Sequence, residues 1–213
     1  RIVTFSQYDT IFGRPTIRIS NGIDFAHIPL KTNVNDTSNT VHLLGVADIH
    51  FWHGFDRVVA GLADYYRRPH EKEVIFHIVG GGSRFTVPEL REQVREQGME
   101  ERVVLHGPLW GEALDRAFEE ADLGIASLGR HRNGITHIKT LKNREYAARG
   151  IPFVYSENDS DFDAMPYVLK APADESPIDI DALLHFLDGV DRDPAHIRAS
   201  IEDTLSWDVQ MRK

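Results

Sequence analysis

The chain has 213 residues, a formal net charge of -9 and no cysteine. The lack of cysteine excludes disulfides and thiolate metal sites, and the acidic balance argues against nucleic acid as the main partner. No apolar run approaches the length of a transmembrane helix, and no secretory signal is visible. We therefore expect a globular protein of the cytoplasm. Because the chain begins at Arg1, we also expect it to be a piece of a longer protein.

The first forty residues show little sign of a core of their own. Two short β-like runs, Ile2–Ser6 and Thr16–Ser20, flank a polar turn and suggest the end of a preceding domain. Asn21-Gly22 is a strong turn signal, and the polar residues 31–40 indicate a loop or linker.

From residue 41 onward, apolar runs alternate with segments of helical periodicity. Strands are predicted at 41–47, 74–80, 103–107, 123–127, 152–156 and 167–171, and helices at 54–66, 88–97, 112–121, 140–149 and 180–187, with a polar helical tail through Trp207. Continuously apolar strands that alternate with amphipathic helices indicate a parallel sheet covered on both faces. We predict a doubly wound α/β domain over about residues 22–200.

A basic segment interrupts this acidic chain just before the helix predicted at 140–149. Between Gly124 and Arg149 the only carboxylate is Glu145, while the same window holds Arg130, Arg132, Lys139, Lys142, Arg144, Arg149, His131 and His137. A positive field that leads into a helix N-terminus favours an anionic ligand such as a phosphate. Glu145 lies one turn into the helix and leans back toward its start, where it could reach a ribose diol. The alternative is a solvated basic loop before a core helix, with Glu145 complementing the helix dipole.

Familiar nucleotide fingerprints do not fit the glycine turn Gly80-Gly81-Gly82. The third glycine of a dinucleotide motif would fall on Phe85, and the turn follows the second strand instead of the first. No Gly-Lys-Ser/Thr triplet of a P-loop occurs. The turn either lets a ligand approach backbone amides or only connects a strand tightly to a helix.

The histidines and aspartates do not predict a metal site. His50 and His53 are three residues apart, but no HExxH motif and no third ligand accompany them. Asp159, Asp161 and Asp163 fall in a loop after the fifth strand. We expect neither a metal nor a cofactor; the expected small molecule is a nucleotide-sugar substrate of UDP or GDP type.

Five segments in a fixed order carry a resemblance to a known family: NGID, IVGGGS, RVVLHGPL, ADLGIASL and LKNREYAARGIPFVYS. The set resembles the C-terminal, nucleotide-sugar-binding domain of retaining GT-B glycosyltransferases of family 4 (group 1). The resemblance implies that residues 1–20 end an acceptor-binding N-terminal domain and that 21–200 form a Rossmann-like donor domain. Residues 201–213, around Ser206-Trp207-Asp208, would cross back to the first domain.

The same resemblance implies which residues bind the donor. Its diphosphate would lie over the helix start at Thr140, Leu141 and Lys142, and Glu145 would hold the ribose. The glycine turn falls on Gly81, Gly82 and Ser83, the base lies near Gly107 to Leu109, and His53 and Gly54 could line the cleft. Catalytic residues on the acceptor side are not assigned.

Two departures from the family pattern stand out. The family pattern has two glutamates, and the position of the first holds His137 in this chain. The family also has two cationic residues after the first strand, and their positions hold Asp48 and His53. We therefore expect the phosphate charge to be met by Lys142, Lys139 or Arg130.

The leading hypothesis is the donor-binding half of a retaining glycosyltransferase that acts on a glycan or lipid-linked acceptor in polysaccharide biosynthesis. The full-length protein would then associate peripherally with the inner face of the membrane. A noncatalytic nucleotide-sugar-binding module and a GT-B-shaped nucleotide-sugar epimerase are the alternatives.

Overall fold

The structure is a computed structural model that describes residues 1–33 and 39–213. Its strands are β1 (Ile2–Thr4), β2 (Thr10–Ile11), β3 (Arg14–Arg18), β4 (Thr40–Val46), β5 (Glu73–Val79), β6 (Val103–Gly107), β7 (Leu123–Ile125), β8 (Phe153–Tyr155) and β9 (Val168–Lys170). Its α-helices are α1 (Phe55–Tyr66), α2 (Thr86–Glu96), α3 (Glu112–Glu120), α4 (Leu141–Arg149), α5 (Ile180–Gly189), α6 (Pro194–Leu205) and α7 (Trp207–Met211). Two 3₁₀ turns, η1 (Phe51–His53) and η2 (Arg130–Asn133), follow β4 and β7.

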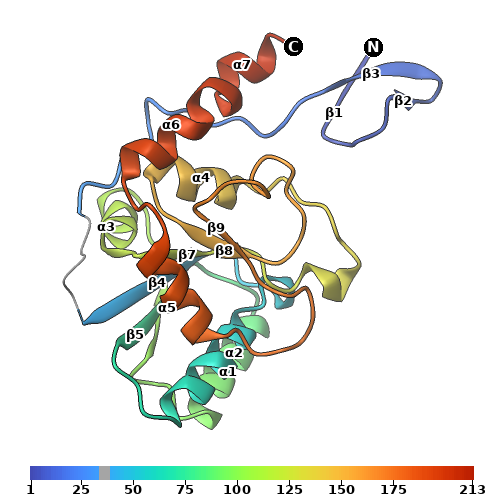
Figure 1. The fold of residues 1–213 in the computed structure, drawn as a ribbon. Coiled ribbons are helices and arrows are strands. Elements are labelled where there is room, and N and C mark those ends of the chain that lie inside the picture. Colours follow the sequence, from blue (N-terminus) through green and yellow to red (C-terminus); the bar gives the residue numbers. More distant parts are fainter. Residues whose placement is uncertain (34–38) are drawn as a thin grey trace.

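The main sheet has six parallel strands in the order β6-β5-β4-β7-β8-β9 (Figure 1). β4 is the first of these strands in the chain and lies in the middle of the sheet. The chain builds outward from β4 through β5 to β6, and then crosses over to build outward again from β7. Such double winding creates a switch point between β4 and β7, and the loops that leave these two strands at their carboxyl ends diverge there.

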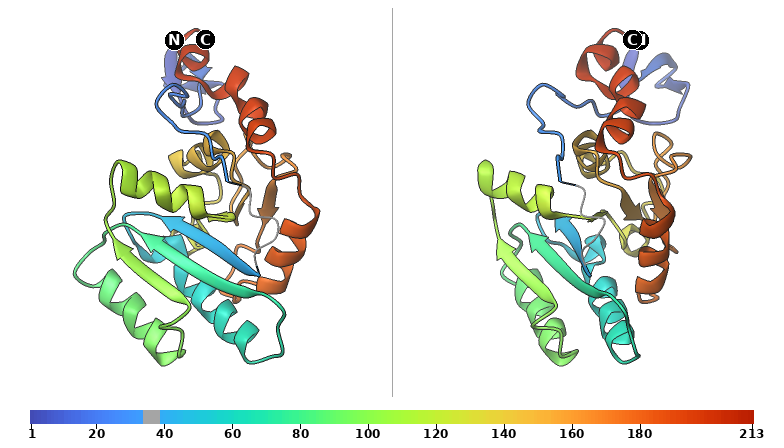
Figure 2. Two further views of the ribbon diagram at one scale, coloured as in Figure 1. Left: turned by 90° about the vertical axis from the view of Figure 1, so that its left-hand side faces the viewer. Right: turned by 60° about the vertical axis from the view of Figure 1, so that its left-hand side comes forward.

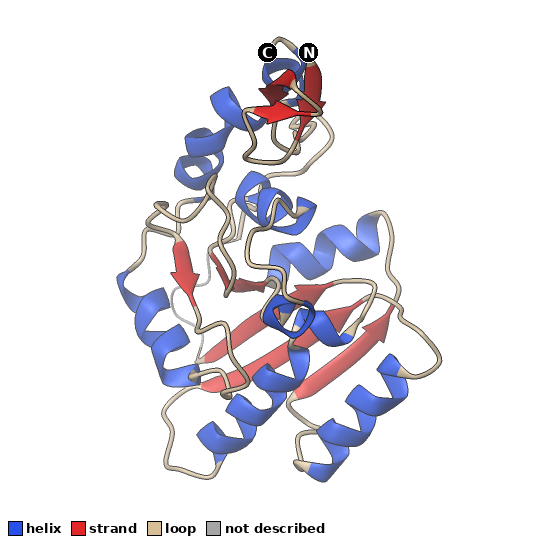
Figure 3. Cartoon of the chain, turned by 90° about the vertical axis from the view of Figure 1, so that its right-hand side faces the viewer, coloured by secondary structure: helices blue, strands red, loops and turns tan. Residues whose placement is uncertain are grey.

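Helices cover both faces of the sheet, as Figure 3 shows. On one face α1, α2 and α5 bury Val58, Leu90 and Leu183 against Phe76 and Leu123. The inner strands β7 and β8 are buried on both sides, which explains their unbroken apolar sequences.

On the other face α3, α4 and α6 bury Phe118, Tyr146 and Ile201 against Leu44 and Phe153. α4 is fixed at its end by Gly150, whose φ of 78° is left-handed and whose Cβ position is occupied by Pro194. α5 and α6 begin at aspartate caps, since Asp179 accepts from the amide of Ala182 and Asp193 from that of Ala195.

The two ends of the chain lie side by side, away from the main sheet (Figures 1 and 2). β1, β2 and β3 form a small separate sheet. The connection to the main body pairs with the break between α6 and α7: the amide of Ile23 donates to Leu205 O (2.8 Å), and that of Trp207 donates to Ile23 O (3.2 Å). Gly22 is required here, because a Cβ would lie 2.5 Å from the Trp207 ring.

The predicted doubly wound α/β fold is confirmed. The strand predicted at 123–127 is regular only to Ile125, although the amide of Ala126 still donates to Val154 O (2.9 Å). The amide of Leu128 then donates to His53 O at the switch point. Sequence inspection missed β2 and both 3₁₀ turns. Of the linker predicted at 31–40, residues 34–38 lie outside the described residues. The predicted tail is α6 followed by α7, and the predicted division at residue 201 falls inside α6.

No helix among residues 1–33 and 39–213 is both long enough and apolar enough to cross a membrane.

Candidate functional site

The loops that leave β4 and β7 are joined at the switch point. The amide of Leu128 donates to His53 O (3.0 Å), and Arg132 Nη1 donates to Phe51 O (2.6 Å). The contact is close because Gly54 and Gly129 lack side chains: a Cβ on Gly54 would lie 2.7 Å from Leu128 C. The fold therefore presents η1, η2 and the start of α4 around one edge of the sheet.

Five buried side-chain polar atoms lack a hydrogen-bond partner among the described residues, and all five belong to this region. They are Ser127 Oγ, Arg130 Nε, His131 Nδ1, Lys142 Nζ and Glu157 Oε2. Folded proteins pair nearly all of their buried polar groups, so an unpaired group calls for a ligand, a water or another explanation. Their concentration at the carboxyl ends of β7 and β8 and on the first turn of α4 marks a candidate ligand site.

Lys142 is a buried cation with a strongly lowered pKa. Its ammonium nitrogen is buried, although part of the side chain reaches solvent, and it lies 5.8 Å from the centre of the Phe55 ring. Burial, followed by the charge of Arg130, lowers the pKa of Lys142 to about 7, against an opposing effect of Glu157. A phosphate beside this amine would favour its protonated form.

Arg130 and Glu157 are the charged residues whose fields act on Lys142. The Arg130 guanidinium lies 5.3 Å above the Trp52 ring, and burial lowers the pKa of Arg130. The carboxylate of Glu157 accepts from the amide of Arg130 (2.6 Å) and from Ser156 Oγ (3.1 Å), both through Oε1. Arg130 Nε and Glu157 Oε2 are the atoms left without partners.

His53, predicted as a possible cleft residue, is buried beside these cations. Burial and then the charges of Lys142 and Arg130 lower the pKa of His53 to about 2, so the imidazole is neutral. Its Nδ1 accepts from the amide of His50 (3.0 Å), and the neutral ring therefore carries its proton on Nε2. His53 supplies a hydrogen-bond donor to this region without adding charge.

The first turn of α4 leaves its amides open to a ligand. Thr140 has an extended backbone at the N-cap, but its hydroxyl donates to Asn143 Oδ1 (3.0 Å) and makes no cap to the backbone. No acidic residue lies in the first turn. Leu141 is 61% exposed at this end of the helix. These are the conditions under which a helix N-terminus attracts an anion.

Not all the predicted cations face this site. Lys139 donates to Ser160 Oγ (2.9 Å) and pairs with Asp161 (2.8 Å). Arg144 is fully buried and pairs with Asp159 (2.9 Å) and Asp161. Of the three cations predicted to meet a phosphate, Lys142 and Arg130 are available, whereas Lys139 is already paired within this aspartate cluster.

Glu145 is held by its own helix. Arg149 Nε and Nη2 both donate to Glu145 Oε1 (3.1 Å each), and the Glu145 side chain is 31% exposed. Arg149 also pairs with Asp115 on α3 (2.9 Å) and stacks on Phe118. Arg149, one of the cations of the basic segment, thus holds the carboxylate that is predicted to contact a ribose.

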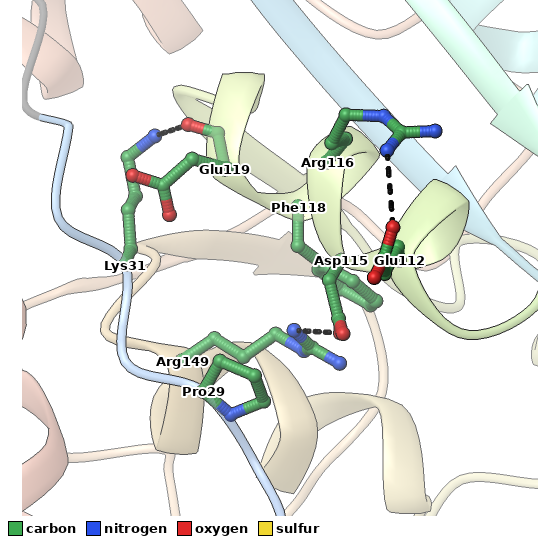
Figure 4. A pocket seen from close by; sticks show the side chains of 8 residues that line it. All are labelled: Pro29, Lys31, Glu112, Asp115, Arg116, Phe118, Glu119 and Arg149. Atoms are coloured by element: carbon green, nitrogen blue, oxygen red, sulfur yellow. Dashed lines mark hydrogen bonds and ion pairs between the residues drawn. The ribbon is translucent and has the colours of Figure 1, made fainter.

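A cavity of about 340 Å³ adjoins this arginine, between α3, α4 and the segment at residues 29–31 (Figure 4). Its lining contains none of the predicted site residues: Pro29, Lys31, Glu112, Asp115, Arg116, Phe118, Glu119 and Arg149. The charged groups in Figure 4 pair largely with one another, so the cavity lacks the unpaired donors that a diphosphate requires.

The predicted glycine turn lies at the carboxyl end of β5. The amide of Ile49 donates to Gly81 O (2.6 Å), and a Cβ on Gly81 would lie 3.6 Å from Pro108, just before Leu109. Ser83 Oγ accepts from the amides of Phe85 and Thr86 (3.1 Å each), which makes Ser83 part of the start of α2. The turn and the loop at 107–109 adjoin each other, as a shared base site would need.

His137 is exposed and its ring contacts Thr136 Oγ1 (3.0 Å). Sequence reasoning missed Ser127 and Glu157 as site residues. Ser127 ends the strand predicted at 123–127 and Glu157 follows the strand predicted at 152–156, so polar residues at strand ends were the available signal. The burial of Glu157 beside Arg130 could not be read from that signal.

No protein-family model matches the sequence, and no curated protein matches it. Solved structures do match. The lipopolysaccharide outer core galactosyltransferase WaaB in its apo form is 20% identical, with a TM-score of 0.62 over 95% of this chain and 55% of that one. Anabaena HepE in complex with UDP and glucose is 16% identical, with a TM-score of 0.69 over 94% of this chain and 56% of that one.

A third match is the C-terminal domain of LpcC, a glycosyl transferase group 1 family protein from Francisella tularensis. It is 13% identical, with a TM-score of 0.54 over 85% of this chain and 90% of that one. This chain therefore spans little more than half the length of WaaB and HepE, and nearly all of a separate C-terminal domain. Its fold is that of the C-terminal, Rossmann-like domain of GT-B glycosyltransferases.

Proposed function

We propose that this chain is the donor-binding part of a glycosyltransferase that transfers a sugar from a nucleotide-sugar to an acceptor. The observation that carries the proposal is the pair of buried, unpartnered cationic atoms, Lys142 Nζ and Arg130 Nε, beside the uncapped start of α4. They lie at the carboxyl edge of the sheet, where doubly wound folds bind their ligands.

Transfer of a glycosyl group requires stabilisation of the nucleoside diphosphate that departs. In this site Lys142, Arg130 and the first amides of α4 would take up the developing negative charge. Because these groups are fixed by the fold and shielded from water, they need little reorganisation as the charge develops. Glu145 would accept from the ribose hydroxyls, and the base would lie against the glycine turn and the loop at 107–109.

The finer features of the proposal derive from the resemblance and from what the matched structures bind. HepE was solved with UDP and glucose, which supports a UDP-type donor; a GDP-type donor remains part of the proposal. We propose retention of anomeric configuration and a glycan or lipid-linked acceptor in polysaccharide biosynthesis. We also propose a cytoplasmic location, with peripheral contact of the full-length protein with the inner face of the membrane, and no cofactor beyond the substrate.

Calorimetric titration with UDP, GDP and the matching nucleosides tests the proposal. We expect at least one diphosphate to bind. Lys142→Glu should lower the affinity for that diphosphate by about 10-fold or more and change the affinity for the nucleoside little, since contacts to charged groups carry most of this difference. Lys72→Glu, which reverses an ammonium on the surface, is the matched control. Equal losses for diphosphate and nucleoside would contradict a phosphate role for Lys142.

The same preparation tests whether the chain acts alone. Transfer needs donor and acceptor held in near-attack positions, and the chain covers about half of the matched enzymes. We expect binding of the nucleotide without transfer of sugar. Robust transfer by residues 1–213 would show that the acceptor site lies within this chain.

A further inference from the structure

The unpaired atoms of the site do not all suit a phosphate. Lys142 Nζ and Arg130 Nε can only donate, and a phosphate satisfies both. Glu157 Oε2 can only accept when the carboxylate is ionised, and a phosphate dianion beside it would be repelled. The ligand that completes this site must therefore supply hydrogen-bond donors as well as acceptors.

Glu157 is well placed to be a binding group. Its side chain is almost fully buried, with the residue only 3% exposed. The amide of Arg130 and Ser156 Oγ hold Oε1, at 2.6 Å and 3.1 Å, and so fix the orientation of the carboxylate while Oε2 stays unpaired. A carboxylate oriented in advance loses little conformational entropy when a ligand binds.

Glu157 and Ser127 share one corner of the site. The amide of Ser156 donates to Ser127 O (3.1 Å), which places the loop after β8 against the loop after β7. Ser127 Oγ is fully buried and also lacks a partner. A hydroxyl both donates and accepts, so it complements an unpaired carboxylate oxygen and an unpaired serine together.

The backbone brings Glu157 beside the segment that contains His137. The amide of Ile138 donates to Asn158 O (2.8 Å) and the amide of Asn158 donates to Thr136 O (2.9 Å). These contacts pair the backbone of Asn158, the residue after Glu157, with the segment that contains the exposed His137. The loop after β8 therefore supplies the negative acceptor that the segment at 136–138 does not.

We propose that Glu157 binds hydroxyl groups of the donor's sugar through its unpaired Oε2, while Lys142 and Arg130 bind the adjoining diphosphate. The inference rests on the proposed function and extends it, because it assigns sugar recognition to a residue on the loop after β8. A sugar joined to a diphosphate offers acceptors to Lys142 Nζ and Arg130 Nε and hydroxyl groups to Glu157 Oε2 and Ser127 Oγ.

The test compares the affinity for a nucleoside diphosphate with that for its nucleotide-sugar, using UDP with UDP-glucose and GDP with GDP-mannose. Glu157→Gln keeps the shape but removes the charge. We expect this substitution to lower the affinity for the nucleotide-sugar by about 10-fold or more, which is the usual effect of losing a hydrogen bond to a charged group. Affinity for the bare diphosphate should stay the same or rise, because a neighbouring negative charge is removed. Glu202→Gln, an exposed glutamate on α6, is the matched control.

A second measurement needs no variant and guards against misfolding of Glu157→Gln. Nucleotide-sugars that lack single hydroxyls of the sugar are titrated into the unaltered chain, and at least one should bind about 10-fold more weakly. If Glu157→Gln lowers the affinity for diphosphate and nucleotide-sugar equally, or if no hydroxyl matters, the inference is wrong while the proposed function stands. If the unaltered chain binds neither kind of ligand, the proposed function fails and the inference fails with it.

Discussion

The buried ammonium of Lys142 should make the unliganded fold less stable than it would be with an apolar side chain. Burial lowers the pKa of this amine to about 7 from an ordinary value of 10.5. The folded protein therefore binds the proton less tightly than the unfolded chain does. At pH 7 this difference costs roughly 3–5 kcal/mol, at 1.36 kcal/mol per unit of pKa.

The sign of the pH dependence follows directly. Because the pKa is lower in the folded state, the cost is greatest below pH 7 and declines as the pH rises from about 7 toward 10.5. Lys142→Met removes the charge and nearly preserves the length of the side chain. We expect this variant to be more stable at pH 7 by roughly 3 kcal/mol, and to lack the rise in stability between pH 7 and pH 9.

Urea unfolding of both proteins at several pH values between 6 and 9 measures this directly, since the midpoint and slope give the free energy of unfolding. Lys72→Met, on the surface, controls for the loss of one positive charge. The variant should also lose affinity for the nucleoside diphosphate that binds the unaltered chain. If Lys142→Met is no more stable than the unaltered chain at pH 7, or if the stability of both has the same pH dependence, the buried amine does not destabilise the fold by this amount.

Three other predictions concern single residues. Glu145→Gln should weaken nucleotide binding about 5- to 150-fold, whereas the affinity for a 2′,3′-dideoxy nucleotide should hardly change with this substitution. If the losses of affinity from the substitution and from the missing hydroxyls simply add, Glu145 only complements the helix dipole. Burial and the neighbouring His42 and His106 lower the pKa of His77 to about 4. Because the ring is partly exposed and solvent screens its charge, the fold should lose only roughly 1–2 kcal/mol as the pH falls from 6.5 to 4, and His77→Gln should flatten that loss in urea titrations; an unchanged slope would assign the acid sensitivity elsewhere. Gly54→Ala should lower the free energy of unfolding by several kcal/mol because of its φ of 69° and the contact with Leu128. Gly134→Ala, at φ 72° with open space around it, should lower it by about 1 kcal/mol. Similar losses for the two variants in urea unfolding would show that the loops after β4 and β7 are not tightly joined.

The sequence alone determined the fold class, because the information lies in local periodicity. Continuously apolar runs such as 123–127 and 152–156 are buried on both sides, and helical spacing in the intervening segments supplies the cover. The basic segment and the helix start at Thr140 were also visible, since charge and helix-stop residues such as Gly150 are properties of the chain itself.

Tertiary structure decided which of these charges are free. Lys139, Lys142 and Arg144 look alike in sequence, yet folding pairs Lys139 and Arg144 with the aspartates at 159 and 161 and leaves Lys142 Nζ buried without a partner. The difference arises because residues about twenty positions apart meet only when β8 lies beside β7. The buried carboxylate of Glu157 is likewise oriented by the amide of Arg130. The two residues meet because the parallel strands β7 and β8 bring the loops that follow them to the same edge of the sheet.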